Sequence, residues 1–213
     1  MNNPHLVYFA DPMCSWCWGF SPVIAAITER FGSTLPIRLV MGGLRPGTMT
    51  PMNAEDSENV RSHWQHVHDA SQQPFDFSFF DRDRFVYDTE PACRAVVVMR
   101  RHGMELGLAA LRRIHEAFYA ENRDVTDIAT LATIVTELGL DEDAFRGEFA
   151  AEAAKRETLS DFAIAQNAGV RGFPTVIAGA GKDNGYALVT NGFQSAANIL
   201  PALERWIGEC KAT

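Results

Sequence analysis

The chain has few cysteines, four in 213 residues, which excludes a small scaffold held together by disulfides. No apolar run approaches the roughly 20 residues that a membrane-spanning helix requires. The N-terminus has no charged segment leading into a long apolar stretch, so we expect no signal peptide and predict a cytoplasmic protein. No basic stripe offsets the net charge of −8, which argues against nucleic-acid or membrane partners.

Two of the cysteines are paired in the segment Cys14-Ser15-Trp16-Cys17. An apolar run over residues 6–10 precedes this segment, and a helical pattern over residues 15–31 follows it. The N-terminus of a helix favours a thiolate over a thiol, because its N–H groups are unpaired and its dipole is positive there. A second thiol one turn later can attack a disulfide that the first one forms. The spacing therefore predicts a dithiol that cycles between reduced and oxidised forms.

Strand and helix patterns divide the chain into two parts. Strands are predicted over residues 6–10, 36–41, 173–178 and 186–189, with a turn over 179–185 and a final helix over 195–210. The middle is helical, with predicted helices over 53–70, 91–102, 106–120, 128–138 and 142–167, the last being one helix or two. The phenylalanine-rich segment 72–85 is predicted to be a packed loop. We therefore predict an α/β fold of order β-α-β…β-β-α (residues 1–52 and 155–213) with an inserted all-helical domain (residues 53–154).

Motifs at both ends of the chain resemble one known family. The segment Asp11-Pro12-Met13-Cys14-Ser15-Trp16-Cys17-Trp18-Gly19-Phe20 is followed by Gly42-Gly43-Leu44-Arg45-Pro46-Gly47 and, far downstream, by Gly172-Phe173-Pro174-Thr175. Together they resemble the DsbA-like branch of the thioredoxin superfamily, and in detail its FrnE-like members, which are predicted protein-disulfide isomerases. The resemblance covers essentially the whole chain and implies a thioredoxin-like fold with thiol–disulfide oxidoreductase activity.

The resemblance also implies roles for single residues. Cys14 matches the nucleophilic cysteine of the family, and Cys17 matches the resolving cysteine. Pro174 matches the cis-proline beside the dithiol, which leaves the backbone of Phe173 free to pair with an extended substrate. Trp16 is expected to support substrate binding. The implied partners are proteins or peptides carrying thiols or disulfides, with glutathione as a possible co-substrate. We expect no cofactor besides the redox-active disulfide, and no metal.

One position departs from the family pattern. A buried acidic residue usually stands six positions before the first cysteine and helps to move the proton of the resolving thiol, whereas this chain has Tyr8 there. Asp11 is the nearest carboxylate in the sequence. It either accepts that proton or opens the turn together with Pro12, and the turn is favoured because Asp-Pro is a common turn opener.

Other readings of the same residues remain open. The Ser-Trp pair between the cysteines adds no positive charge, so we expect a less oxidising protein than DsbA itself. Zinc binding at the dithiol is disfavoured, because a structural zinc usually needs a second pair of ligands and Cys93 and Cys210 are single. Cys93 is expected to pack in the core, and Cys210 stands near the end of the last predicted helix. The histidines at 63, 66 and 68 are expected to form a solvated helix face. The alternative functions are a glutathione-dependent transferase or isomerase of the same fold, and a peptide-binding holdase without turnover; the oligomeric state stays open.

Overall fold

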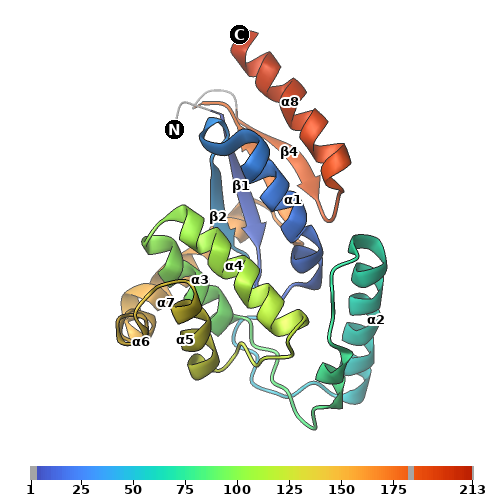
Figure 1. Ribbon diagram of the computed structural model, residues 1–213, viewed down its shortest axis with the longest axis vertical. Coiled ribbons are helices and arrows are strands. Elements are labelled where there is room, and N and C mark those ends of the chain that lie inside the picture. The colour runs from blue at the N-terminus through green and yellow to red at the C-terminus, as the bar shows by residue number, and fades with distance from the viewer. Residues whose placement is uncertain (1–3, 182–184, 213) are drawn as a thin grey trace.

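A four-stranded sheet forms the centre of the molecule (Figure 1). The computed structural model describes residues 4–181 and 185–212. The strand order is β2-β1-β3-β4, with β1 parallel to β2, antiparallel to β3, and β3 antiparallel to β4. The strands are β1 (His5–Ala10), β2 (Ile37–Met41), β3 (Thr175–Gly179) and β4 (Tyr186–Asn191). The first strand, helix and second strand follow in the predicted β-α-β order, and the two strands pair in parallel.

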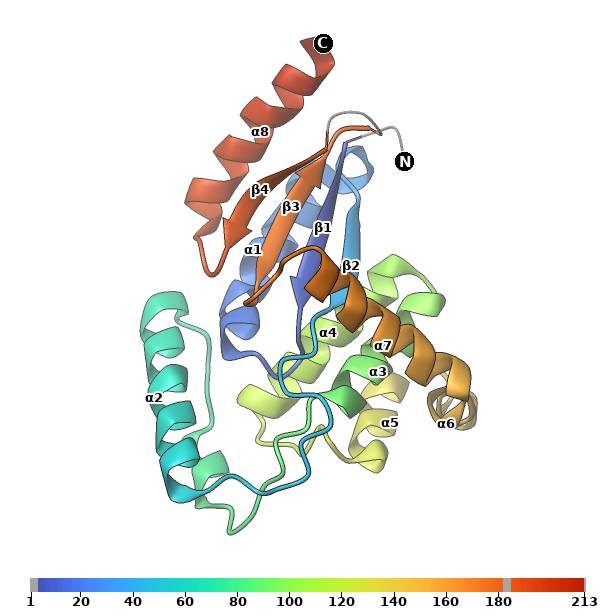
Figure 2. The same ribbon diagram turned by 180° about the vertical axis from the view of Figure 1, so that it is seen from behind.

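Helices cover both faces of the sheet, as the two views together show (Figures 1 and 2). Successive strand residues point to opposite faces, so Tyr8 packs with α1 (Ser15–Phe31) while Val7 and Phe9 pack under α7 (Glu152–Asn167). The helix α8 (Ala196–Ala212) lies beside α1 on the Tyr8 face. Both faces of β1 are therefore buried, as expected for the central strand that leads to the dithiol.

Helix α1 has sharp boundaries that the sequence predicts correctly. It begins directly after Cys14 and ends at Gly32, whose φ of +50° lies in the region that favours glycine. Pro22 lies inside it. The side chains of α1 that face the sheet are apolar, which fixes the first turn of the helix against the end of β1.

The middle of the chain is helical, as predicted. Its helices are α2 (Ala54–Ser71), α3 (Glu90–Arg101), α4 (Met104–Tyr119), α5 (Ile128–Glu137) and α6 (Glu142–Ala150), followed by α7. The region predicted as one helix or two is two, because Ala151 has extended backbone angles between α6 and α7. The predicted boundary at residue 154 falls inside α7, and the buried residues of both parts form one continuous cluster. The division into two domains stays a prediction.

The phenylalanine-rich segment packs around a single indole. Trp64 of α2 stacks on Phe79 at 4.9 Å between ring centroids, and it also contacts Phe75 and Phe80. A short 3-10 helix, Phe77–Asp81, forms within this segment. Part of the predicted 179–185 turn lies outside the described residues. Within the described residues, no helix combines the length and the apolar character needed to cross a bilayer.

Candidate active site

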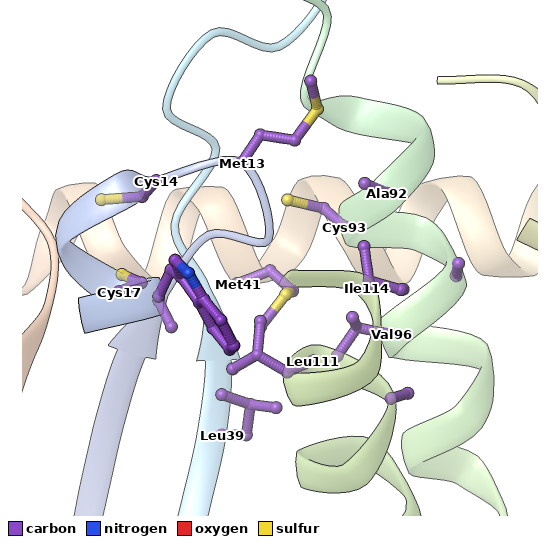
Figure 3. Packing of buried hydrophobic residues seen from close by; sticks show 14 of the residues in the cluster. Met13, Cys14, Cys17, Leu39, Met41, Ala92, Cys93, Val96, Leu111 and Ile114 are labelled. Carbon is purple, nitrogen blue, oxygen red and sulfur yellow. The ribbon is translucent and has the colours of Figure 1, made fainter. Parts of the chain in front are cut away.

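The two paired cysteines lie where β1 passes into α1. Cys14 occupies the N-cap of α1, and its carbonyl accepts hydrogen bonds from the N–H groups of Cys17 (2.9 Å) and Trp18 (3.1 Å). Both side chains lie at the start of α1 (Figure 3). Cys14 is 6% exposed, whereas Cys17 in the first turn is 0% exposed. All four cysteines are free thiols in this structure. Of the pair, Cys14 is therefore the one that an outside molecule can approach.

The segment at Phe173, from the far end of the chain, lies against Cys14. The Cys14 thiol donates to the carbonyl oxygen of Phe173 at 3.5 Å, and the Phe173–Pro174 peptide bond is cis. The Phe173 ring rests on Gly42, where an added Cβ would lie 2.1 Å from ring atom Cζ. A side chain at position 42 would therefore push this ring away, so the packing of Phe173 requires glycine at position 42 of the Gly42-Gly43 segment.

The mouth of the site carries partly exposed apolar side chains. Trp16 is half-buried, and its ring lies 5.8 Å from that of Phe193, between ring centroids. Leu44, in the loop after β2, is 41% exposed. Trp16, two residues after Cys14, therefore presents apolar surface near a sulfur that is itself only slightly exposed.

Burial is the main influence on the Cys17 thiol. Removal from water raises its pKa well above the usual range, and the neighbouring Cys14 and the Asp11 charge add to the rise, while the main-chain N–H of Asp11 opposes it. Burial raises the pKa of the Tyr8 hydroxyl, and the nearby sulfur of Cys17 raises it further. Cys17 is thus held as a neutral thiol while the pair is reduced.

The Asp11 carboxylate is completely buried and binds three segments together. It accepts the Met13 N–H at 2.9 Å, the Leu44 N–H at 2.7 Å and the Cys93 thiol at 3.4 Å. Burial raises the pKa of this carboxyl, and the hydrogen bonds from Leu44 and Met13 partly oppose that rise. The bond to Met13, two residues on, is the Asx-type turn that the Asp-Pro pair predicts. The role as proton acceptor stays a prediction.

Two residues between the ends of the inserted region hold the dithiol turn, and no pattern in the sequence predicts either of them. The Tyr87 hydroxyl donates to the carbonyl of Met13 at 2.7 Å. His115 of α4 places Nε2 3.1 Å from the carbonyl of Asp11 and Nδ1 3.3 Å from the Ser21 hydroxyl. Burial lowers the pKa of His115 to about 4, so it carries no charge near neutral pH. Tyr87 lies in the segment before α3 and His115 lies within α4, and neither stands in a recognisable sequence motif.

The remaining cysteines and histidines divide into core and surface. Cys93 is buried, as expected, but it does more than fill space, because its thiol contacts Asp11 and its sulfur faces the dithiol turn (Figure 3). Cys210 is half-buried in α8. His63 and His66 are exposed on α2, and His68 bonds to the carbonyl of Gln73 at 2.8 Å. Across residues 4–181 and 185–212, no three histidine, cysteine or acidic side chains cluster in a way that could hold a metal ion.

Comparison with solved structures gives relatives over nearly the whole chain. A candidate protein disulfide isomerase from Nitrosomonas europaea is 35% identical with a TM-score of 0.89, covering 97% of this chain and 98% of that one. The cytosolic disulfide reductase DsbM from Pseudomonas aeruginosa is 27% identical with a TM-score of 0.73, covering 98% and 97%. A second structure of DsbM contains GSH and is 26% identical with a TM-score of 0.71, covering 98% of each chain.

Among curated proteins, the ClpXP adapter protein SpxH of Bacillus subtilis is 24% identical over 178 residues, covering 82% of this chain. The chain spans only 58% of the length of that relative. The family described as DSBA-like thioredoxin domain matches residues 5–204, a range that contains the dithiol, the helical region and the Phe173 segment. The sheet, the thiols at the start of α1 and this match agree: the chain belongs to the DSBA-like thioredoxin domain family.

Proposed function

We propose that the protein is a thiol–disulfide oxidoreductase in which Cys14 is the nucleophile and Cys17 the resolving thiol. The observation that carries the proposal is the position of the pair. Cys14 sits at the N-terminus of a 17-residue helix, where unpaired N–H groups and the helix dipole favour a thiolate, and it is the more exposed of the two. Cys17 lies one turn further on with no exposed surface. Membership of the family supports the same assignment.

The exchange proceeds in two balanced steps. The Cys14 thiolate attacks one sulfur of a substrate disulfide; the substrate S–S bond breaks, one substrate thiolate leaves, and a mixed disulfide with Cys14 remains. Cys17 then loses its proton and attacks the Cys14 sulfur, which releases the second substrate thiolate and leaves a Cys14–Cys17 disulfide. The substrate gains two electrons and the protein loses two. Run in reverse, the same steps oxidise a substrate dithiol.

The surroundings of Cys14 favour an extended peptide or a small thiol as substrate. The carbonyl of Phe173 is 3.5 Å from the Cys14 sulfur and marks where a substrate backbone would pass. The half-buried Trp16 offers apolar contact two residues after Cys14. Such a contact suits sulfur-containing chains of varied sequence.

Glutathione is the proposed small co-substrate. DsbM, a relative over the whole chain, is named a cytosolic disulfide reductase and has a structure with GSH. The same likeness supports a cytoplasmic location and a reductase or isomerase direction for this protein. His115, whose imidazole contacts the dithiol turn, is uncharged at neutral pH and adds no cation to stabilise the reduced pair. We therefore expect a potential below the roughly −120 mV of DsbA, measurable by equilibration with glutathione.

Insulin reduction and reshuffling of a scrambled disulfide protein test the function. Turnover in either assay supports the proposal; an isomerase or transferase of this fold would need glutathione and an organic substrate, and a holdase or adapter would show no turnover.

Cys14→Ser should abolish exchange, and Cys17→Ser should accumulate mixed disulfides on Cys14 that mass spectrometry detects. Cys210→Ser, in a half-buried cysteine of α8, is the matched control and should keep full activity. Full activity in Cys14→Ser would refute the assignment.

A further inference from the structure

A cavity lies between two helices that come from different parts of the chain. Helices α1 and α4 lie against each other (Figure 1), and the space that remains between them has a volume of about 500 Å³. This volume is within the range of small-molecule sites. The described lining residues include neither Cys14 nor Cys17, so the cavity is separate from the site proposed for thiol exchange.

The walls of the cavity are mainly apolar. Tyr8, Ile24 and Leu111 are buried side chains that line it. Ala25 of α1 and Ala109 of α4 add small side chains, which leave a space between the helices that a longer side chain would fill. Ala25 is exposed, so the cavity opens on the molecular surface. A small apolar molecule can therefore enter and displace water from these walls.

Two hydroxyl groups of the wall already use their protons inside the protein. Ser21 has one O–H, and both groups within its reach accept: the Cys17 carbonyl at 3.2 Å and Nδ1 of His115 at 3.3 Å. His115 is neutral and gives its Nε2–H to the carbonyl of Asp11, which leaves Nδ1 as an acceptor. Thr28 likewise donates to a main-chain carbonyl one turn back at 3.0 Å. Ser21 and Thr28 can therefore offer only lone pairs to a ligand, which call for a donor on that ligand.

The charged side chains of the wall favour a donor as well. Glu29 in the last turn of α1 and Glu105 in the first turn of α4 are both exposed. Arg112 is the one cation among the described lining residues, so the carboxylates outnumber it. Arg30, the neighbour of Glu29 in the sequence, is paired with Glu204 of α8 at 2.6 Å. Within the part of the chain that the structure describes, neither Glu29 nor Glu105 forms an ion pair, so both are available to a cation.

We propose that this cavity binds a small apolar molecule that carries a protonated amine. The apolar body lies between Ala25 and Ala109, and the ammonium donates to the acceptors of the wall, above all to the carboxylates of Glu29 and Glu105. An anion of the same shape would meet two like charges, and a pure hydrocarbon would leave the acceptors without a partner. The site requires no thiol chemistry and stands apart from the proposed function.

Three naphthalene compounds that share a two-ring body test the site: naphthylmethylamine, naphthylmethanol and naphthoate. Each is titrated into isotope-labelled protein, and NMR follows the amide signals. The amine should shift signals of α1 and α4 and should bind about tenfold more tightly than naphthoate, with the alcohol between them. An exposed charge pair changes affinity by up to about fivefold, and naphthoate reverses the sign of that contribution.

Substitutions in the wall then separate charge from shape. Glu105→Gln should weaken binding of the amine about threefold and leave the alcohol unchanged, whereas Arg112→Gln should strengthen binding of the amine. Both side chains are exposed, so neither change should disturb the fold. Ala109→Leu fills the cavity and should abolish binding of all three compounds. Glu116→Gln, in an exposed acid of α4 that is not among the described lining residues, is the matched control and should change nothing.

Opposite effects of Glu105→Gln and Arg112→Gln on the amine, with shifts centred on α1 and α4, would support the site. Equal affinities for the three compounds would reveal an unselective apolar surface and overturn the proposal. Shifts confined to other elements, or no saturable shifts with the amine, would overturn it too. Each of these failures leaves the proposed function standing, because exchange at Cys14 is measured independently.

Discussion

Removal of the His115 imidazole should change how the stability of the fold depends on pH. His115 is completely buried, with Nε2 at the carbonyl of Asp11 and Nδ1 at the Ser21 hydroxyl. Burial lowers its pKa from 6.5 to about 4 in the folded protein. In the unfolded chain the ring takes up a proton near 6.5. Between these two values the unfolded state therefore binds more protons than the folded state does.

The sign and size of the effect follow from this difference. The folded form is favoured fully above pH 6.5, and the advantage is lost as pH falls towards the folded pKa of about 4. A shift of about 2.5 pKa units at 1.36 kcal/mol each amounts to roughly 3 kcal/mol. This is a large part of the 5–15 kcal/mol that typically stabilises a domain. His115 should therefore be a main site of acid sensitivity.

Urea denaturation of the wild type, His115→Phe and His63→Asn at pH 7, 5.5 and 4 measures this effect. At pH 7, His115→Phe should lose roughly 1–3 kcal/mol of stability, because the Asp11 carbonyl and the Ser21 hydroxyl each lose a partner. Between pH 7 and pH 4 the wild type should lose roughly 3 kcal/mol more than His115→Phe, so at pH 4 the variant should be as stable as the wild type or more stable. His63→Asn changes an exposed histidine of α2 and should follow the wild type. A gap that stays constant over this range would refute the reasoning.

Two further substitutions test the contacts around the dithiol. Gly42→Ala places a Cβ 2.1 Å from the Phe173 ring, so it should destabilise the fold by roughly 1–3 kcal/mol and slow insulin reduction. The control Gly147→Ala, which has open space around its Cβ in α6, should stabilise the fold by up to about 1 kcal/mol. Equal thermal shifts for the two would contradict this. Asp11 has a raised pKa, so the stability that it contributes at acid pH is lost as pH rises through that raised value. Asp11→Asn should remove this decline in a series of denaturation curves, and an unchanged slope would show that the carboxyl is not desolvated.

Local patterns in the sequence predict the parts of the site that depend on neighbours along the chain. The N-terminus of α1 at Cys14 and its end at Gly32 follow from the thiol spacing, the apolar period and the glycine, and the structure has both. The contact between Cys14 and Phe173 spans 159 residues, and only the resemblance to a family pairs them in advance. The partnership of Asp11 with Cys93 has no local signal at all, since a single cysteine in an apolar helix is typical of core packing.

The contacts that hold the dithiol turn come mostly from the helical region. Tyr87 binds the carbonyl of Met13, His115 binds that of Asp11, and Cys93 binds the carboxylate of Asp11. Tyr87, Cys93 and His115 are all buried, so each contact is made inside the protein. The helical region therefore clamps the backbone before Cys14. If substrate binds at Cys14 as we propose, this clamp should keep the two thiols in place while it does so.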